Sequence, residues 1–271
     1  MENLLVLAAM GALLLLSGAV SGVLAGLLGV GGGIVLVPAF FYVFGALGFG
    51  GPDLMQLCLG TSLATIIVTS IRSTLAHDRK GAVDWAILKS WVPGIVVGAL
   101  LGMLVASRLS STVLQAMFGG LAAIVGLYLA FGQEHWRVGQ RMPGGIIRVV
   151  MSSVMGFFSV LMGIGGGSFG VPIMTAFNVP IHKAVGTAAG FGLAIAVPSV
   201  AGFLFTQVTA APPLTVGSVN LIAFGLVVLM TVLTAPFGAT LAHRTDAGAL
   251  RRIFGFFLII VALNMLRDVL F

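Results

Sequence analysis

Two runs of three glycines carry the clearest chemical signal in this sequence. One lies in GLLGVGGGIVLVPAFF and the other, 134 residues later, in SVLMGIGGGSFGVPIM, and each is followed at the same distance by a proline, Pro38 or Pro172. Glycine backbone adopts unusual angles and lets a ligand approach its N–H groups closely. A short helix beginning after each run would point free N–H groups and a positive dipole end at the break. An anion site is therefore predicted at these glycines: Gly31, Gly32, Gly33, Gly165, Gly166 and Gly167.

Hydroxyl side chains near the triplets could add directional donors to such a site. Ser168 directly follows the second triplet, and Thr61 and Ser62, with Thr187 in the other half, lie about two turns into later segments. Their O–H groups could bond the oxygens of an oxyanion. Helix-interior serines and threonines can instead bond back to their own backbone, so both interpretations stay open.

The sequence contains only weak matches to known catalytic motifs. Gly166–Gly170 fits G-x-S-x-G, but that elbow needs a strand–turn–helix and a histidine partner. The histidines fall at segment ends or in loops: His77, His135, His182 and His243. No group of His, Cys and carboxylate residues has metal-ligand spacing. We therefore expect no enzymatic activity, no catalytic residue, no metal and no cofactor.

The composition places this chain in a membrane. Of its 271 residues, 59% are hydrophobic and 7% are charged, whereas soluble domains carry roughly 25% charged residues. Runs such as 54–76 and 220–242 approach the roughly 20 apolar residues that cross a bilayer as a helix. The first 22 residues resemble a leader, but Glu2 and the absence of Lys or Arg favour a first membrane segment. The formal charge of +6 comes from a few short loops, which argues against nucleic-acid binding.

Ten apolar segments follow one another along the chain. They cover about 3–28, 34–47, 54–76, 86–106, 112–131, 146–163, 168–178, 183–206, 216–242 and 249–270. The second and seventh follow the triplets and are too short for comfortable spans, so whether they cross or re-enter the membrane stays open. The longest polar stretch separates five segments from five. We expect a first repeat at 1–131, a cytoplasmic linker at 132–145 and a second repeat at 146–271.

The two halves share motifs beyond the triplets. LCLGTSLA resembles KAVGTAAG, with Gly60-Thr61 matching Gly186-Thr187. GMLVASRLSSTVLQAMFGG likewise resembles GATLAHRTDAGALRRIFGF, with Arg108 matching Arg244. An internal duplication explains these matches. Other glycines, spaced four apart, are typical of close helix packing instead: Gly22 and Gly26, and Gly94, Gly98 and Gly102.

Basic residues set the predicted orientation. If the segments alternate, most cations fall on one side: Arg79, Lys80, Lys89, Arg137, Arg141, Arg148, Lys183, Arg244, Arg251 and Arg252. Only Arg108 and Arg267 fall on the other. Cationic loops stay cytoplasmic, so both termini are expected outside the cytoplasm. Five segments per half insert the second repeat upside down. We therefore expect an all-α polytopic fold of two inverted repeats whose broken short helices meet near the midplane.

The paired motifs GVGGGIVLVP and GIGGGSFGVP, with the GTS and GTA echoes, resemble the sulfite exporter TauE/SafE family, also called the toluene-sulfonate uptake permease family. LAHDRKGAVDW at 75–85 and LRRIFGFFLIIVALNML at 250–266 extend the resemblance over essentially the whole chain. It implies a bacterial inner-membrane permease for anions such as sulfite, sulfoacetate or other organosulfonates. Asn220 in place of Asp84-Trp85, and Ile34 opposite Ser168, argue against a strictly symmetric site.

The acidic residues fall at termini or in loops, whereas a proton relay usually needs an ionisable group inside the membrane. An inside-negative potential favours anion efflux by roughly 2.3 kcal/mol per charge per 100 mV, so export needs no coupling ion. We expect a transporter that exports a sulfur-containing anion by alternating access, with that anion and the lipid bilayer as its partners. An anion channel, an uptake permease, an intramembrane enzyme and a membrane sensor are the alternatives. The anion, the coupling and any homo-oligomer stay open.

Overall fold

The computed structural model describes residues 2–28, 32–132, 138–242 and 247–270. Within them the chain forms one helix for each predicted apolar segment: α1 (Glu2–Leu28), α2 (Gly33–Ala46), α3 (Leu54–Asp78), α4 (Trp85–Ala106), α5 (Ser111–Phe131), α6 (Gly145–Leu161), α7 (Gly167–Ala176), α8 (Ile181–Phe203), α9 (Leu221–Ala242) and α10 (Ala247–Leu270). A 3-10 turn, η1 (Gly51–Asp53), precedes α3. Some residues named above lie outside the described residues: Gly31, His135, Arg137, His243 and Arg244.

A two-stranded hairpin, β1 (Thr215–Val216) and β2 (Val219–Asn220), occupies the predicted start of the ninth segment at 216. The helix begins only at Leu221, because Asn220 Oδ1 accepts a hydrogen bond from the Ala223 N–H at 2.9 Å and so caps α9. Gly217 supplies the left-handed turn residue between the strands, at φ 58°. Strands of two residues are too short to show the alternation of apolar and polar side chains that predicts a strand. The sequence therefore indicated only a continuous apolar segment here.

Six of the described helices are long and apolar enough to cross a membrane. They are Ala8–Gly26 within α1, Gly51–Asp78 across η1 and α3, all of α4, α5 and α8, and Leu221–Gly238 within α9. The helices after the two triplets are shorter, with 14 residues in α2 and 10 in α7. At about 1.5 Å rise per residue, neither reaches a hydrocarbon thickness of roughly 30 Å. The chain is a multi-pass membrane protein with a short helix after each break.

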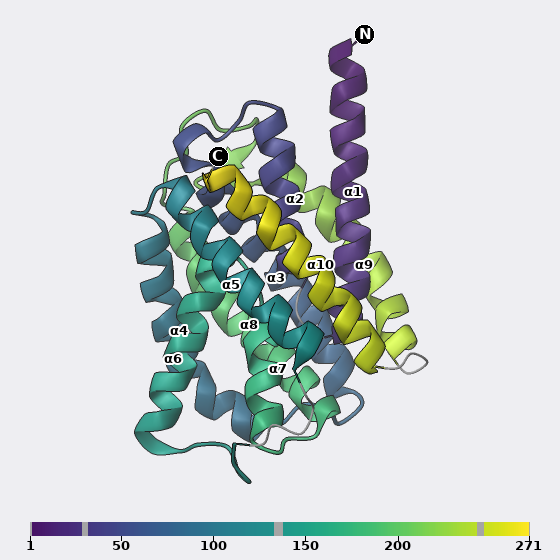
Figure 1. The fold of residues 1–271 in the computed structure, drawn as a ribbon, viewed down its shortest axis with the longest axis vertical. Helices are drawn as coiled ribbons and strands as arrows, with labels where there is room; N and C mark the ends of the chain where they lie inside the picture. Colours follow the sequence, from purple (N-terminus) through teal and green to yellow (C-terminus); the bar gives the residue numbers. More distant parts are fainter. Residues whose placement is uncertain (1, 29–31, 133–137, 243–246, 271) are drawn as a thin grey trace.

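Helices α3 and α8 pack against each other at the centre of the bundle and run antiparallel (Figure 1). Thr187, near the start of α8, bonds to Asp84, just past the end of α3. At the other end, Phe203 accepts a hydrogen bond from Ser218, which lies against Gly60 near the start of α3. Each end of this central pair is therefore tied to a different connecting segment.

Three outer helix pairs surround the centre: α1 with α9, α4 with α6, and α5 with α10. Glycines bring their backbones close, since a methyl group on Gly98 of α4 would overlap a carbonyl of α6, and one on Gly238 of α9 would overlap a carbonyl of α1. Gly22, Gly94 and Gly102 also lie against a partner helix, which confirms the predicted packing role of these glycines.

The two short helices occupy different ends of the molecule. Figure 1 shows α2 toward the end at which α1 begins, and α7 toward the opposite end. The last helix, α10, finishes toward the same end at which the first begins (Figure 1). The breaks that precede α2 and α7 therefore approach one another from opposite sides of the bundle.

Candidate functional site

The two glycine breaks meet inside the bundle. A methyl group on Gly33 would overlap the carbonyl oxygen of Gly163 and lie 3.0 Å from Cα of Ile164. Gly32, which precedes α2, takes the left-handed conformation at φ 69° and is buried against α1. Only glycine combines that conformation with so close an approach. The structure thus brings Gly32 and Gly33 to the second break, while Gly31 lies outside the described residues.

The second break follows a different backbone path. Gly163 is left-handed at φ 58°, whereas Gly166, which precedes α7, is right-handed at φ −65°. A methyl group on Gly166 would overlap Phe191 of α8 and lie 2.8 Å from the carbonyl oxygen of Ala188. Helix α8 therefore packs directly on this backbone. The two breaks adjoin each other without sharing one conformation.

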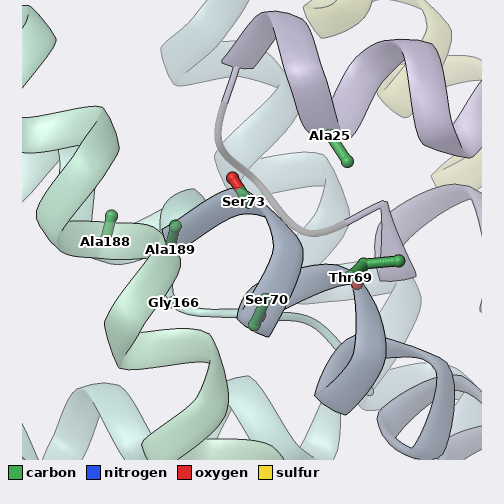
Figure 2. Close-up of a pocket in the computed structure, with 8 residues that line it drawn as sticks. Ala25, Thr69, Ser70, Ser73, Gly166, Ala188 and Ala189 are labelled. Carbon is green, nitrogen blue, oxygen red and sulfur yellow. The ribbon is translucent and has the colours of Figure 1, made fainter. Parts of the chain in front are cut away.

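A small cavity lies against the second triplet (Figure 2). Its volume is ≈ 10 Å³, about the space needed by one water molecule. It is lined from α1, α3, the break and α8 by Ala25, Thr69, Ser70, Ser73, Gly165, Gly166, Ala188 and Ala189. None of these described residues carries a charge. The cavity meets hydroxyl-bearing residues on its α3 side and only small side chains on its α8 side.

Three hydroxyl-bearing residues of α3 line the cavity but are absent from the site predicted from the sequence. Thr69, Ser70 and Ser73 share one face of the helix, and that spacing is the signal that could have found them. Thr69 Oγ1 donates to the Thr65 carbonyl oxygen of its own helix at 3.1 Å. Ser70 is buried, and a methyl group on Gly192 of α8 would overlap its Oγ. The α3 face therefore presents hydroxyl oxygens to the second break.

Two of the predicted hydroxyls, Ser168 and Ser62, lie at this break and differ in their bonding. Ser168 is 6% exposed, and its Oγ has no hydrogen-bond partner within the described part of the chain. It is the second residue of α7, after Gly167, so it lies among N–H groups that lack partners within the helix. Ser62 Oγ instead donates to the Gly163 carbonyl oxygen at 2.8 Å. Among the described residues, the Ser168 hydroxyl has no acceptor, whereas the Ser62 hydroxyl bonds to the backbone of the break.

The other two predicted hydroxyls, Thr61 and Thr187, are fully buried, and none of the four predicted hydroxyls lines the cavity. Thr61 Oγ1 accepts a hydrogen bond from the Asn220 N–H at 3.0 Å, and Thr187 Oγ1 accepts one from the Asp84 N–H at 2.9 Å. Each hydroxyl thus bonds to the backbone just before another helix. A direct contact between these hydroxyls and an anion stays a prediction.

Replacing Ser62 with alanine tests its support of the break. Ser62→Ala leaves the buried Gly163 carbonyl without its side-chain donor, and an unpaired buried polar group costs about 1–3 kcal/mol. We expect a lower unfolding temperature for the purified protein in detergent. Ser199→Ala is the control, because Ser199 is equally buried and donates only to Ile195 of its own helix. Equal unfolding temperatures for the two variants would contradict the supporting role.

Comparisons with known proteins agree with a membrane transporter. The family model for sulfite exporter TauE/SafE matches residues 14–265. A protein of Haemophilus influenzae, named a probable membrane transporter protein, is 30% identical over 255 residues, which cover 93% of this chain and 97% of the relative. Relatives from Methanocaldococcus jannaschii and Bacillus subtilis, also named probable membrane transporter proteins, are 27% and 29% identical. Their matches cover 81% and 65% of this chain, and 80% and 71% of the relatives. No solved structure matches the chain significantly.

Proposed function

The chain belongs to the sulfite exporter TauE/SafE family of membrane transporters, and on that premise we propose that it exports a small sulfur-containing anion through the site where its glycine breaks meet. The observation that carries the proposal is the approach of Gly33 to Gly163. It joins two breaks that lie far apart in the sequence. Backbone of irregular shape at membrane depth is tolerated where it is buried in protein or lines a cavity, and here it does both.

The second break supplies the anion-binding chemistry. Gly165 and Gly166 line the cavity, and α7 begins at the next residue. The first N–H groups of a helix have no intrahelical acceptor, and its N-terminal end is electropositive. An anion is therefore attracted without a lysine or arginine in the cavity wall. Ser168 Oγ is buried and has no partner among the described residues, so it adds a donor whose missing acceptor an oxyanion would provide.

Sulfite and sulfonates suit this arrangement because three oxygens on one sulfur can accept from several donors at once. The donors that we assign are the N–H groups at the start of α7, the Ser168 hydroxyl, and the Ser70 and Ser73 hydroxyls of α3. The choice of sulfite, sulfoacetate or another sulfonate among small oxyanions follows from family membership. It is this choice that a ligand panel tests.

The small volume of the cavity favours alternating access over a channel. A volume of ≈ 10 Å³ is too small for any of these anions, so the protein must open to admit one. Export follows because an inside-negative potential drives an anion outward by roughly 2.3 kcal/mol per charge per 100 mV. Flux in proteoliposomes should saturate with substrate and show counter-transport. Linear flux without exchange would indicate the channel, and inward accumulation would indicate uptake.

We assign the chain to a bacterial inner membrane as two inverted repeats, 1–131 and 146–271, joined by a cytoplasmic linker at 132–145. The packing is consistent with exchange of the halves, since α1 packs on α9 as α6 packs on α4, and α3 packs on α9 as α8 packs on α4. The short α2 and α7 then re-enter from opposite membrane faces. The basic loops favour an orientation with both termini outside the cytoplasm.

A ligand panel on purified protein tests the substrate class. We expect sulfite, sulfoacetate or a related sulfonate to raise the unfolding temperature. A ligand at 100 times its dissociation constant stabilises a protein by about 2.7 kcal/mol. Sulfate, thiosulfate and taurine define the preference, and uncharged analogues of similar size are the control. Equal stabilisation by the uncharged analogues would overturn the anion assignment.

A further inference from the structure

Gly60 and Thr61 dock the start of α9 onto the central helix α3. The Thr61 hydroxyl accepts from the N–H of Asn220, whose side chain caps α9 by accepting from Ala223 at 2.9 Å. A methyl group on Gly60 would overlap the carbonyl oxygen of Ser218, two residues before the cap. Glycine is therefore needed for the contact, and threonine supplies its hydrogen bond.

Gly186 and Thr187 dock the start of α4 onto α8 in the same way. The Thr187 hydroxyl accepts from the N–H of Asp84, whose carboxylate caps α4 by accepting from Ala86 at 3.1 Å and from the following residue at 3.0 Å. A methyl group on Gly186 would overlap the carbonyl oxygen of Ala82, again two residues before the cap. The two contacts share the threonine acceptor, the capping side chain and the close approach of a glycine.

The two contacts lie at opposite ends of the α3–α8 pair, and each adjoins the cavity or the break. Thr187 directly precedes Ala188 and Ala189, which line the cavity. Thr61 directly precedes Ser62, which bonds to Gly163 of the second break. Movement of either contact is therefore passed to the site through adjacent residues of one rigid helix.

We propose that these contacts are two equivalent latches, the Thr61 latch with Asn220 and the Thr187 latch with Asp84, which open in turn to admit the anion from opposite membrane faces. The inference rests on the proposed transport by alternating access. Both latches are formed here, and the cavity has room for about one water molecule, as expected of a state that has not opened to admit the anion from either side. Thr61 and Thr187 are then positioning residues that act through the helices they hold. The basic loops predict that the Thr187 latch faces the cytoplasm.

The threonine hydroxyl is a suitable latch because removing this buried hydrogen-bond acceptor destabilises the closed contact by a predictable free energy. Thr61→Val and Thr187→Val keep the side-chain shape but leave the N–H of Asn220 or Asp84 without its acceptor. One buried hydrogen bond corresponds to a shift of about tenfold in a two-state equilibrium. Each substitution should therefore favour opening at its own face by about that factor.

The test is one-sided labelling of a single cysteine. Ala189→Cys puts a thiol in the cavity wall, and Cys58→Ala removes the native cysteine, the only one in the sequence. A charged, membrane-impermeant methanethiosulfonate reagent is added to one face of right-side-out or inside-out vesicles. We expect Thr61→Val to raise the labelling rate about tenfold from the Asn220 face alone, and Thr187→Val from the Asp84 face alone.

Matched variants separate a latch from a general loss of stability. Thr65→Val removes an equally buried hydroxyl of α3 that donates within its own helix, so it should change labelling from neither face. Thr61→Ser and Thr187→Ser keep the acceptor and should restore the wild-type rates. Equal changes from both faces, or none, would overturn the latches. If Thr61→Val does not fold, Thr187→Val alone tests the proposal. Its labelling rate should then rise from the Asp84 face and not from the Asn220 face.

The labelling requires no substrate, so the two proposals can fail separately. Side-specific labelling together with no response to any anion would leave the latches standing and remove the sulfur-anion assignment. A clear response to sulfite with labelling unchanged in both threonine variants would do the reverse.

Discussion

Gly33→Ala should strongly reduce transport in a protein that still inserts into the membrane. The added methyl group would overlap the Gly163 carbonyl oxygen and lie 3.0 Å from Cα of Ile164, and both are backbone atoms that cannot rotate away. The two breaks must separate to accommodate it. Overpacking of this kind costs about 1–3 kcal/mol, and each 1.4 kcal/mol is a factor of ten in binding. We expect sulfite flux into proteoliposomes to fall at least about tenfold.

Gly225→Ala is the matched control for this substitution. Gly225 lies within α9, and a methyl group there would meet nothing within 4 Å. Alanine in an open helical position should raise stability by roughly 0.5–1 kcal/mol and leave flux unchanged. Wild-type flux in Gly33→Ala, at normal membrane content and monodisperse elution, would remove the meeting of the breaks from the mechanism.

Much of the fold can be read from the sequence because hydrophobic length and glycine placement act locally. Each predicted apolar segment corresponds to a helix, and the triplets at 31–33 and 165–167 precede the short helices α2 and α7. The packing role of Gly98 follows from its spacing alone, since i and i+4 positions share one helix face. The sequence does not directly show that the two breaks adjoin each other. That contact could be predicted only by assuming that the duplicated halves form inverted repeats.

The roles of individual hydroxyls could not be predicted, because they depend on partners far away in the sequence. Thr61 bonds to Asn220 and Ser62 to Gly163, separations of 159 and 101 residues. Nothing in the local sequence distinguishes Ser168, whose Oγ has no partner in the part of the chain that the structure describes, from a serine that bonds to its own helix. The backbone angles could not be predicted either, because the matching glycines Gly32 and Gly166 adopt left-handed and right-handed conformations, respectively. Duplication therefore predicts where the site lies, but tertiary contacts decide which atoms are free to bind.

Ser168→Ala should stabilise the anion-free protein against unfolding and lower its affinity for the anion. The Ser168 hydroxyl is buried without a partner among the described residues, and such a group costs about 1–3 kcal/mol. Removing it relieves that cost when the site is empty but deletes a donor when the site is filled. We expect a higher unfolding temperature without ligand, and an apparent sulfite affinity about tenfold lower, as measured by thermal unfolding at increasing sulfite concentration.

Ser159→Ala is the control that tests whether the gain in stability and the loss of anion affinity are both specific to Ser168. Ser159 of α6 is fully buried, and its Oγ also lacks a partner in the described chain. Neither serine lines the cavity, but only Ser168 lies at the start of α7. Its replacement should raise the unfolding temperature and leave the sulfite response intact. A general gain in packing would appear in both variants, whereas a loss of affinity in Ser168→Ala alone identifies that hydroxyl as a ligand donor. If Ser168→Ala instead lowers the unfolding temperature and keeps wild-type affinity, the hydroxyl serves the fold, and the N–H groups of α7 must hold the anion without it.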